Sequence, residues 1–206
     1  MSCDLVAALI DERPFVLASG SPRRARILEG LGLRFEIEAH GVDEGSPRGE
    51  TGVEHAMRLA LEKARAAAGR RQAGTVLGAD TIVILDKALL GKPASPDEAV
   101  AMLRRLRGRW HEVVTGVALV RASDGAEVLG HERTRVLVRD LSDDEIDGYV
   151  AGGEPLDKAG SYGIQECGAA VVERVEGCFY NVVGLPVARL CILLRELGSS
   201  RRAGTG

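Results

Sequence analysis

Apolar and polar residues form short blocks along the chain, and the period of the pattern changes from one block to the next. Short apolar or alternating runs predict strands, whereas apolar positions spaced three and four apart predict helices. Strands are predicted over residues 15–18, 35–38, 75–85, 113–120, 132–138, 171–172 and 180–183. Helices are predicted over residues 22–32, 53–70, 96–108, 142–152 and 186–198.

Capping and turn residues support these limits. Ser21-Pro22, Ser95-Pro96-Asp97-Glu98 and the stretch from Ser142 to Glu145 each have the residue types that begin a helix. Asp124-Gly125 predicts a hairpin with a long, irregular connection between its strands. Helices alternate with strands on both sides of this hairpin, which predicts an α/β fold with a mixed β-sheet flanked by helices.

The composition is that of a folded globular protein. The chain has 206 residues, of which 45% are hydrophobic and 28% charged, so it can bury a core without disulfides. We expect one domain over residues 1–198, built of two lobes, and a disordered tail over residues 199–206. The 27 Lys and Arg residues against 30 Asp and Glu residues give a net charge of -3, which argues against nucleic-acid binding.

Neither export nor membrane insertion is indicated. The apolar runs are too short to cross a bilayer, and the first residues lack the pattern of a signal peptide. The four cysteines show no C-x-x-C pair and no histidine partner at ligand spacing, which favours reduced thiols over a zinc site. These features predict a cytoplasmic protein that does not bind membranes.

The segment from Ser19 to Arg24 is a candidate phosphate receptor. Arg23 and Arg24 lie in the first turn of the predicted helix, where the helix dipole favours anions over cations. Free backbone N–H groups, the permissive Gly20 and two guanidinium groups would together bind phosphate oxygens. The alternative is an ordinary capped helix whose arginines lie in solvent or pair with acids.

Asp80 interrupts an apolar strand, where aspartate is rare. A buried carboxylate must be paired, hydrogen-bonded or bound to a metal. The neighbours on the same strand face, Gly78 and Ile82, carry no charge, so a partner must come from elsewhere in the fold. Asp80 is therefore a candidate to hold Mg²⁺ or to orient an attacking water. The alternative is a strand-end aspartate bonded to backbone amides.

The chain has only four lysines, so a retained lysine can reflect a need for a compact charge. Lys92, in Gly91-Lys92-Pro93, and Lys158 suit phosphate or base contacts, whereas Lys63 on an alanine-rich helix is more typical of a solvated face. The loop over residues 154–165 contains Tyr162 and Gln165, which suit stacking on a nucleobase and hydrogen bonding to uracil or thymine. A plain surface loop is the alternative.

Five segments, read in order, resemble the Maf family of nucleotide pyrophosphatases. They are Leu17-Ala18-Ser19-Gly20-Ser21-Pro22-Arg23-Arg24, Gly78-Ala79-Asp80-Thr81, Gly91-Lys92-Pro93, Glu154-Pro155-Leu156-Asp157-Lys158-Ala159-Gly160 and Asn181-Val182-Val183-Gly184-Leu185-Pro186. The resemblance covers residues 14–198. It implies a cytoplasmic, metal-dependent enzyme that cleaves a nucleoside triphosphate into the monophosphate and pyrophosphate. It also implies a Maf/ITPase-like fold with two lobes around a central cleft, often as a homodimer.

The resemblance also assigns roles to individual residues. The segment from Asp157 to Gln165 is similar to the family branch that acts on dTTP and UTP, with modified pyrimidine nucleotides as further candidates. Asp80 then matches the proton acceptor, and the residues that set substrate preference are Arg23, Thr81 and Gln165. The implied phosphate- and substrate-binding residues are Ser19, Ser21, Arg24, Lys63, Lys92 and Lys158. The implied metal, Mg²⁺ or Mn²⁺, is held by Asp80 and Glu44.

Two alternatives to the dTTP and UTP assignment stay open. Glu166-Cys167 stands where this branch often has a glycine after the glutamine, which bears on base preference. A family member that prefers 7-methyl-GTP or another modified nucleotide is therefore one alternative. The other is a nucleotide-binding regulator of septum formation with little turnover.

Overall fold

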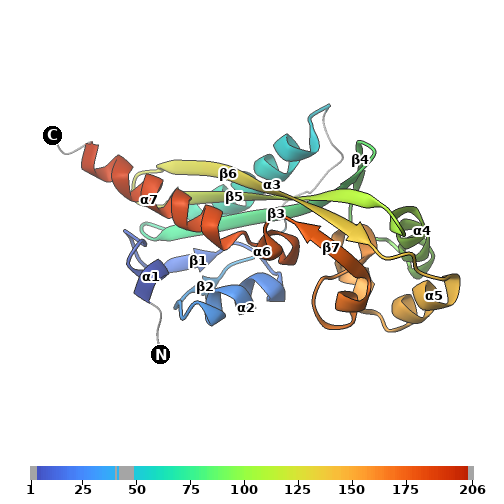
Figure 1. Ribbon diagram of the computed structural model, residues 1–206. Coiled ribbons are helices and arrows are strands. Elements are labelled where there is room, and N and C mark those ends of the chain that lie inside the picture. The colour runs from blue at the N-terminus through green and yellow to red at the C-terminus, as the bar shows by residue number, and fades with distance from the viewer. Residues whose placement is uncertain (1–3, 40, 42–48, 204–206) are drawn as a thin grey trace. The chain divides into compact units, whose positions relative to one another are not determined.

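The computed structural model describes residues 4–39, 41 and 49–203 (Figure 1). The helices are α1 (Asp4–Ala7), α2 (Pro22–Gly30), α3 (Gly52–Ala68), α4 (Pro96–Leu106), α5 (Asp143–Ala151), α6 (Phe179–Val183) and α7 (Val187–Ala203). The strands are β1 (Phe15–Leu17), β2 (Glu36–Ile37), β3 (Thr75–Leu85), β4 (Ala88–Leu90), β5 (Trp110–Arg121), β6 (Glu127–Val138) and β7 (Val172–Glu176). Three 3-10 turns follow α5: η1 (Glu154–Asp157), η2 (Ala159–Ser161) and η3 (Glu166–Ala170).

The strands form one mixed sheet in the order β2-β1-β3-β5-β6-β7, with β4 paired to β3. The β1–β2 and β1–β3 pairs are parallel, whereas the β3–β4 and β6–β7 pairs are antiparallel. The predicted α/β class with a mixed sheet and flanking helices is therefore confirmed.

Contacts divide the chain into two compact units. Unit 1 consists of residues 1–80, 115–132 and 184–206, and unit 2 consists of residues 81–114 and 133–183. The cleft predicted between two lobes stays a prediction.

In unit 1, α3 and α7 cover opposite faces of the long strands (Figure 1). Glycines let α3 approach closely: a Cβ atom on Gly78 would lie 2.1 Å from the carbonyl oxygen of Ala60, and one on Gly116 would lie 2.4 Å from that of Ala56. Such distances are too short for any side chain. The backbone of α3 therefore rests directly on β3 and β5, and this brings short-range contacts between α3 and β3 within reach.

In unit 2, α4 and α5 pack on the apolar ends of the long strands. The buried residues of this core include Val83 of β3, Leu103 of α4, Val136 of β6 and Ile146 of α5. Both predicted helix starts have their cap: Ser95 accepts a hydrogen bond from the N–H of Glu98, and Ser142 and Glu145 form a reciprocal capping box.

The strand predicted over residues 180–183 is wrong, because these residues belong to helix α6. The β-branched valines favour a strand locally, but a buried side chain overrides this preference. The amide nitrogen of Asn181 donates to the carbonyl oxygen of Val113, at 2.9 Å, and to Oγ1 of Thr134, also at 2.9 Å. The backbone N–H groups of Asn181 and Val182 donate to the carbonyl oxygen of Cys178, which closes a helical turn.

The long connection predicted for the hairpin is also wrong. Strand β5 continues to Arg121 and β6 begins at Glu127, so a tight turn joins two long strands. The N–H of Arg121 donates to the carbonyl oxygen of Ala126, and the N–H of Gly125 donates to that of Arg121. Helix α7 likewise passes its predicted end at Gly198 and runs to Ala203.

Candidate active site

The loop between β1 and α2 is organised around the hydroxyl group of Ser19. Its Oγ accepts a hydrogen bond from the backbone N–H of Ser21, at 3.3 Å, and one from Nη1 of Arg24, at 2.8 Å. Ser21 is the N-cap residue of α2, but its side chain makes no capping hydrogen bond. The first turn of α2 therefore lacks the side-chain cap that the sequence predicts.

Arg24 anchors this loop through two hydrogen bonds. Its side chain is buried, with 8% of the residue exposed, and its Nε donates to the carbonyl oxygen of Gly184 at 2.8 Å. Arg24 thus links the loop to the residues just before α7. Arg23 is only half-buried, so the two arginines of the predicted receptor are in different environments.

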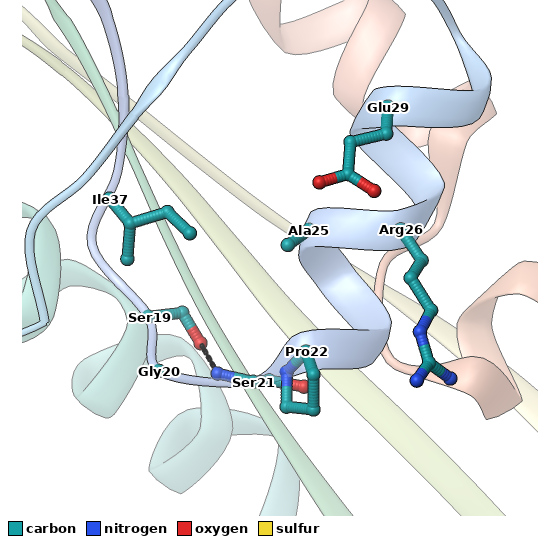
Figure 2. Close-up of a pocket in the computed structure, with 8 residues that line it drawn as sticks. All are labelled: Ser19, Gly20, Ser21, Pro22, Ala25, Arg26, Glu29 and Ile37. Carbon is teal, nitrogen blue, oxygen red and sulfur yellow. Dashed lines mark hydrogen bonds between the residues drawn. The ribbon is translucent and has the colours of Figure 1, made fainter.

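A pocket of about 320 Å³ opens beside this loop (Figure 2). Its polar groups come from the loop and from Glu29 and Arg26 of α2, and its apolar groups from Pro22, Ala25 and Ile37. Figure 2 shows the carboxylate of Glu29 pointing across the pocket toward Ile37. The volume is near the lower end of the range for small-ligand pockets.

Asp80 is buried in β3 and forms an ion pair with a residue of α3. Its Oδ1 lies 2.6 Å from Nζ of Lys63, and the two side chains are 10% and 12% exposed. Asp80 lies on the same strand face as Gly78, against which α3 packs. The partner that the sequence requires for Asp80 is therefore Lys63, and the interpretation of Lys63 as a solvated residue is wrong.

The strand register places this ion pair near the loop. Strands β1 and β3 are parallel, with Leu17 opposite Leu77, and the N–H of Ala18 donates to the carbonyl oxygen of Leu77 at 2.8 Å. Ser19 and Asp80 follow these paired residues by two and three positions, so Asp80 lies within β3 just beyond the carboxyl end of β1, where the loop of Ser19 begins. In open α/β sheets, ligands bind outside the carboxyl ends of the strands.

In unit 2, the structure brings together two loops that carry predicted lysines. The N–H of Gly160 donates to the carbonyl oxygen of Gly91 at 3.0 Å, which joins the loop of Lys158 to that of Lys92. Nζ of Lys158 donates to the carbonyl oxygen of Glu154 and contacts Asp157, so this ammonium group holds its own loop.

The other predicted residues of unit 2 are more accessible. Lys92 and Gln165 are exposed, and Thr81, which directly follows Asp80 in β3, is half-buried. Tyr162 is different: it is only 5% exposed and its hydroxyl group lies 2.6 Å from Nε2 of His111. Its ring is therefore not available to stack on a base, contrary to the prediction.

Two further polar residues, His111 and Tyr149, contact the loop of Lys158 and are not predicted from the sequence. Burial lowers the pKa of His111 to about 4, and burial also raises the pKa of the Tyr149 and Tyr162 hydroxyl groups. No local pattern marks His111, because it lies within an ordinary alternating strand and its partner Tyr162 comes 51 positions later. Tyr149 carries no motif either.

Of the two predicted metal ligands, Asp80 lies in the described part of the chain. Glu44 lies outside the described residues. Among the described residues, no group of three or more His, Cys, Asp and Glu side chains is arranged to hold a metal ion. Mg²⁺ commonly binds through one or two carboxylates together with substrate phosphates, and a single buried carboxylate such as Asp80 fits that mode.

In the described part of the chain, no helix is long and apolar enough to cross a membrane.

Fold and site together define an α/β protein with a serine- and arginine-rich loop beside a buried acid–lysine pair. The chain belongs to the Maf family, because the family model described as "Maf-like protein" matches residues 14–197.

Two relatives illustrate the similarity. A protein of Acetivibrio thermocellus named dTTP/UTP pyrophosphatase is 48% identical over 192 residues, covering 90% of this chain and 96% of the relative. A protein of Hahella chejuensis with the same name is 49% identical, covering 90% of this chain and 93% of the relative. The solved structure of the Staphylococcus aureus Ham1 protein matches with a TM-score of 0.43 and 17% identity, over 62% of this chain and 73% of that one.

Proposed function

We propose that this protein is a nucleoside triphosphate pyrophosphatase that hydrolyses dTTP and UTP to the monophosphate and pyrophosphate. Its membership of the Maf family and the names of its relatives support this reaction. The structural observation that carries it is the buried Lys63–Asp80 pair just beyond the carboxyl end of β1, where the loop of Ser19 begins. An acid close to an anion-binding loop suits attack on a phosphate.

The loop and the first turn of α2 bind the phosphates in this proposal. Backbone N–H groups at a helix N-terminus and the helix dipole both favour an anion. Because the side chain of Ser21 makes no cap hydrogen bond, it does not compete with a ligand for these N–H groups. Arg24 holds Ser19 in place. The positive charge of Arg23 counters the negative charge of the substrate phosphates.

Asp80 is the proton acceptor. Water attacks the α-phosphorus, its oxygen forms the new P–O bond, and its proton passes to a carboxylate oxygen of Asp80. The bond from the α-phosphorus to the bridging oxygen breaks, and pyrophosphate leaves with the electron pair. Lys63 fixes the orientation of the carboxylate before the reaction and counters negative charge on the phosphates.

A divalent cation, Mg²⁺ or Mn²⁺, completes the proposed site, with Asp80 and Glu44 as its protein ligands. When bound, it neutralises charge on the phosphate oxygens. Lys63 already contacts the carboxylate of Asp80, so Lys63 and the cation must share this carboxylate.

Arg23, Thr81 and the exposed Gln165 set base preference in this proposal, and Lys158 supports the loop that carries Gln165. The exposed Lys92 counters negative charge on the phosphates. The names of the relatives favour dTTP and UTP over 7-methyl-GTP, and a pyrophosphatase over a septum regulator with little turnover. We further propose a cytoplasmic homodimer that does not bind nucleic acid.

Product analysis tests the reaction. The protein is incubated with dTTP, UTP, CTP and 7-methyl-GTP in the presence of Mg²⁺ or Mn²⁺, and pyrophosphate and orthophosphate are measured separately. We expect pyrophosphate and monophosphate in equal amounts, with the highest kcat/KM for dTTP and UTP. Release of orthophosphate, or tight nucleotide binding without repeated turnover, would contradict the proposal.

A further inference from the structure

Four consecutive residues of the loop that carries Lys158 and Gln165 are each bonded to a different part of unit 2. The four contacts are Gly160 N–H to the Gly91 carbonyl oxygen at 3.0 Å, Ser161 Oγ to Met102 Sδ at 3.1 Å, Tyr162 OH to His111 Nε2 at 2.6 Å, and Gly163 N–H to Tyr149 OH at 3.1 Å. Four contacts within four consecutive residues fix the shape of this loop.

The turn before Tyr162 is strained and needs this support. Gly160 and Ser161 have φ angles of 71° and 62°, in the left-handed region. For a residue other than glycine, that conformation costs on the order of 1 kcal/mol and persists only where its surroundings enforce it. A Cβ atom on Gly160 would lie 2.9 Å from the side chain of Val83, so the turn is also tightly packed.

Of these four contacts, the one between His111 and Tyr162 joins two polar side chains, and both are buried. The two residues are 4% and 5% exposed, and their rings meet edge to face with centroids 5.3 Å apart. Burial keeps the imidazole neutral, since it lowers the pKa of His111 to about 4. The pair is therefore a bond between two neutral groups that persists over the physiological pH range.

We infer that His111 is a positioning residue for base selection: its hydrogen bond to Tyr162 holds the segment from Lys158 to Gln165 in the shape that presents Gln165. This inference rests on the proposed function, in which Gln165 reads the base. His111 itself does not touch the substrate and acts only through Tyr162. Gln165 is three residues beyond Tyr162, so loss of the anchor displaces it.

The first test is the ratio of kcat/KM for dTTP to that for dCTP, because these bases differ at the edge that an amide would read. Tyr162→Phe keeps the ring and removes the hydroxyl group. We expect it to lower this ratio by about tenfold, in keeping with the effect of small displacements near a reacting substrate. His111→Leu should lower it similarly, and the double variant should lower it no further, because both remove one bond. His111→Gln, which keeps a hydrogen-bonding group, should restore part of the preference.

Thr134→Val is the matched control. Thr134 is also buried in unit 2, and its hydroxyl group bonds to Asn181 and Cys178 rather than to the loop. Thr134→Val and Tyr162→Phe each remove one buried hydroxyl group, so both should lower the unfolding midpoint. Only Tyr162→Phe should change the ratio. An unchanged ratio in Tyr162→Phe, with both variants equally destabilised, would show a purely structural role and overturn the inference.

Amide hydrogen exchange separates this inference from the proposed function. We expect the amides of residues 163–165 to exchange at least about tenfold faster in Tyr162→Phe than in the wild type, and to be unchanged in Thr134→Val. If the wild type released no pyrophosphate from dTTP, the proposed function would fail. Exchange would still decide whether His111 holds the loop, and equal exchange in all three proteins would overturn that statement.

Discussion

Nζ of Lys63 lies 2.6 Å from Oδ1 of Asp80, and both side chains are largely buried between α3 and β3. Replacing Asp80 by asparagine keeps the shape of this side chain and removes its ability to accept a proton. We expect Asp80→Asn to lower kcat for dTTP by at least about a hundredfold, the usual range for loss of general-base catalysis. Pyrophosphate release by the purified variant is the measurement.

Asp86→Asn is the control for this substitution, because Asp86 is exposed and bonds to Arg109 on the surface of unit 2. It makes the same chemical change outside the proposed site. Full turnover by Asp80→Asn, with the metal dependence of the wild type, would remove Asp80 from the mechanism.

The same ion pair has a consequence for stability. Lys63→Met removes the ammonium group and leaves a buried carboxylate, which in buried pairs costs about 3 kcal/mol or more. Adding Asp80→Asn should recover much of that loss, because the charge that needed the partner is gone. Urea unfolding of the two single variants and the double variant measures the coupling energy. Additive effects would mean that the two side chains do not stabilise each other.

Gly78 makes the approach of α3 to β3 possible, and the ion pair depends on that approach. A methyl group on Gly78 would meet backbone atoms of Ala60 and Ala64 at 2.1 and 2.8 Å, so α3 must shift. We expect Gly78→Ala to cost about 3 kcal/mol and to lower kcat, because Lys63 moves away from Asp80. Gly30→Ala, where nothing lies within 4 Å of the added atom, is the control. Thermal unfolding and dTTP turnover are measured for both, and equal behaviour would contradict the prediction.

Substitution of Arg23 and of the adjacent Arg24 should affect stability to different degrees. Arg24 is buried and bonds to Ser19 and Gly184, so Arg24→Met should lower both stability and turnover. Arg23 is less buried than Arg24, so Arg23→Met should lower the unfolding midpoint less than Arg24→Met does. It should lower turnover chiefly by raising KM. A large loss of stability in Arg23→Met would give it the same supporting role as Arg24.

Local pattern predicts much of unit 1, because the signals lie within a few residues of one another. The apolar run of β3 and the Ser21-Pro22 start of α2 are of this kind, and the structure has both. The partner of Asp80 leaves no such local signal, because identifying Lys63 requires knowing that Gly78 lets α3 rest on the strand. The sequence indicates that Asp80 needs a partner but does not identify Lys63 as that partner.

Unit 2 was harder to predict because long-range bonds decide its structure. Residues 180–183 have strand-forming valines, but the bonds of Asn181 to Val113 and Thr134 fix them as a helix. In the same way, the composition of the loop suggested that Tyr162 faces a base, whereas His111 draws its hydroxyl group into the core. Partners so distant in sequence leave no periodic signal.

His111 also predicts how stability depends on pH. Its ordinary pKa of 6.5 falls to about 4 in the folded protein because burial disfavours the charged form. Between these values the unfolded chain binds a proton that the folded protein does not, so unfolding becomes easier as the pH falls. This contribution is fully present above pH 6.5 and is lost toward pH 4, at a slope of up to about 1.4 kcal/mol per pH unit.

The comparison of wild type with His111→Gln isolates this contribution, because the titration of all other groups is common to both proteins. Urea unfolding of each is measured at intervals from pH 7.5 to about pH 4.5, over the range where one histidine changes charge. We expect the wild type to be the more stable at neutral pH and its advantage to shrink steadily below pH 6.5. An advantage that stayed constant across this range would mean that His111 takes up its proton equally in the folded and unfolded states, and that the imidazole is not held neutral by its burial beside Tyr162.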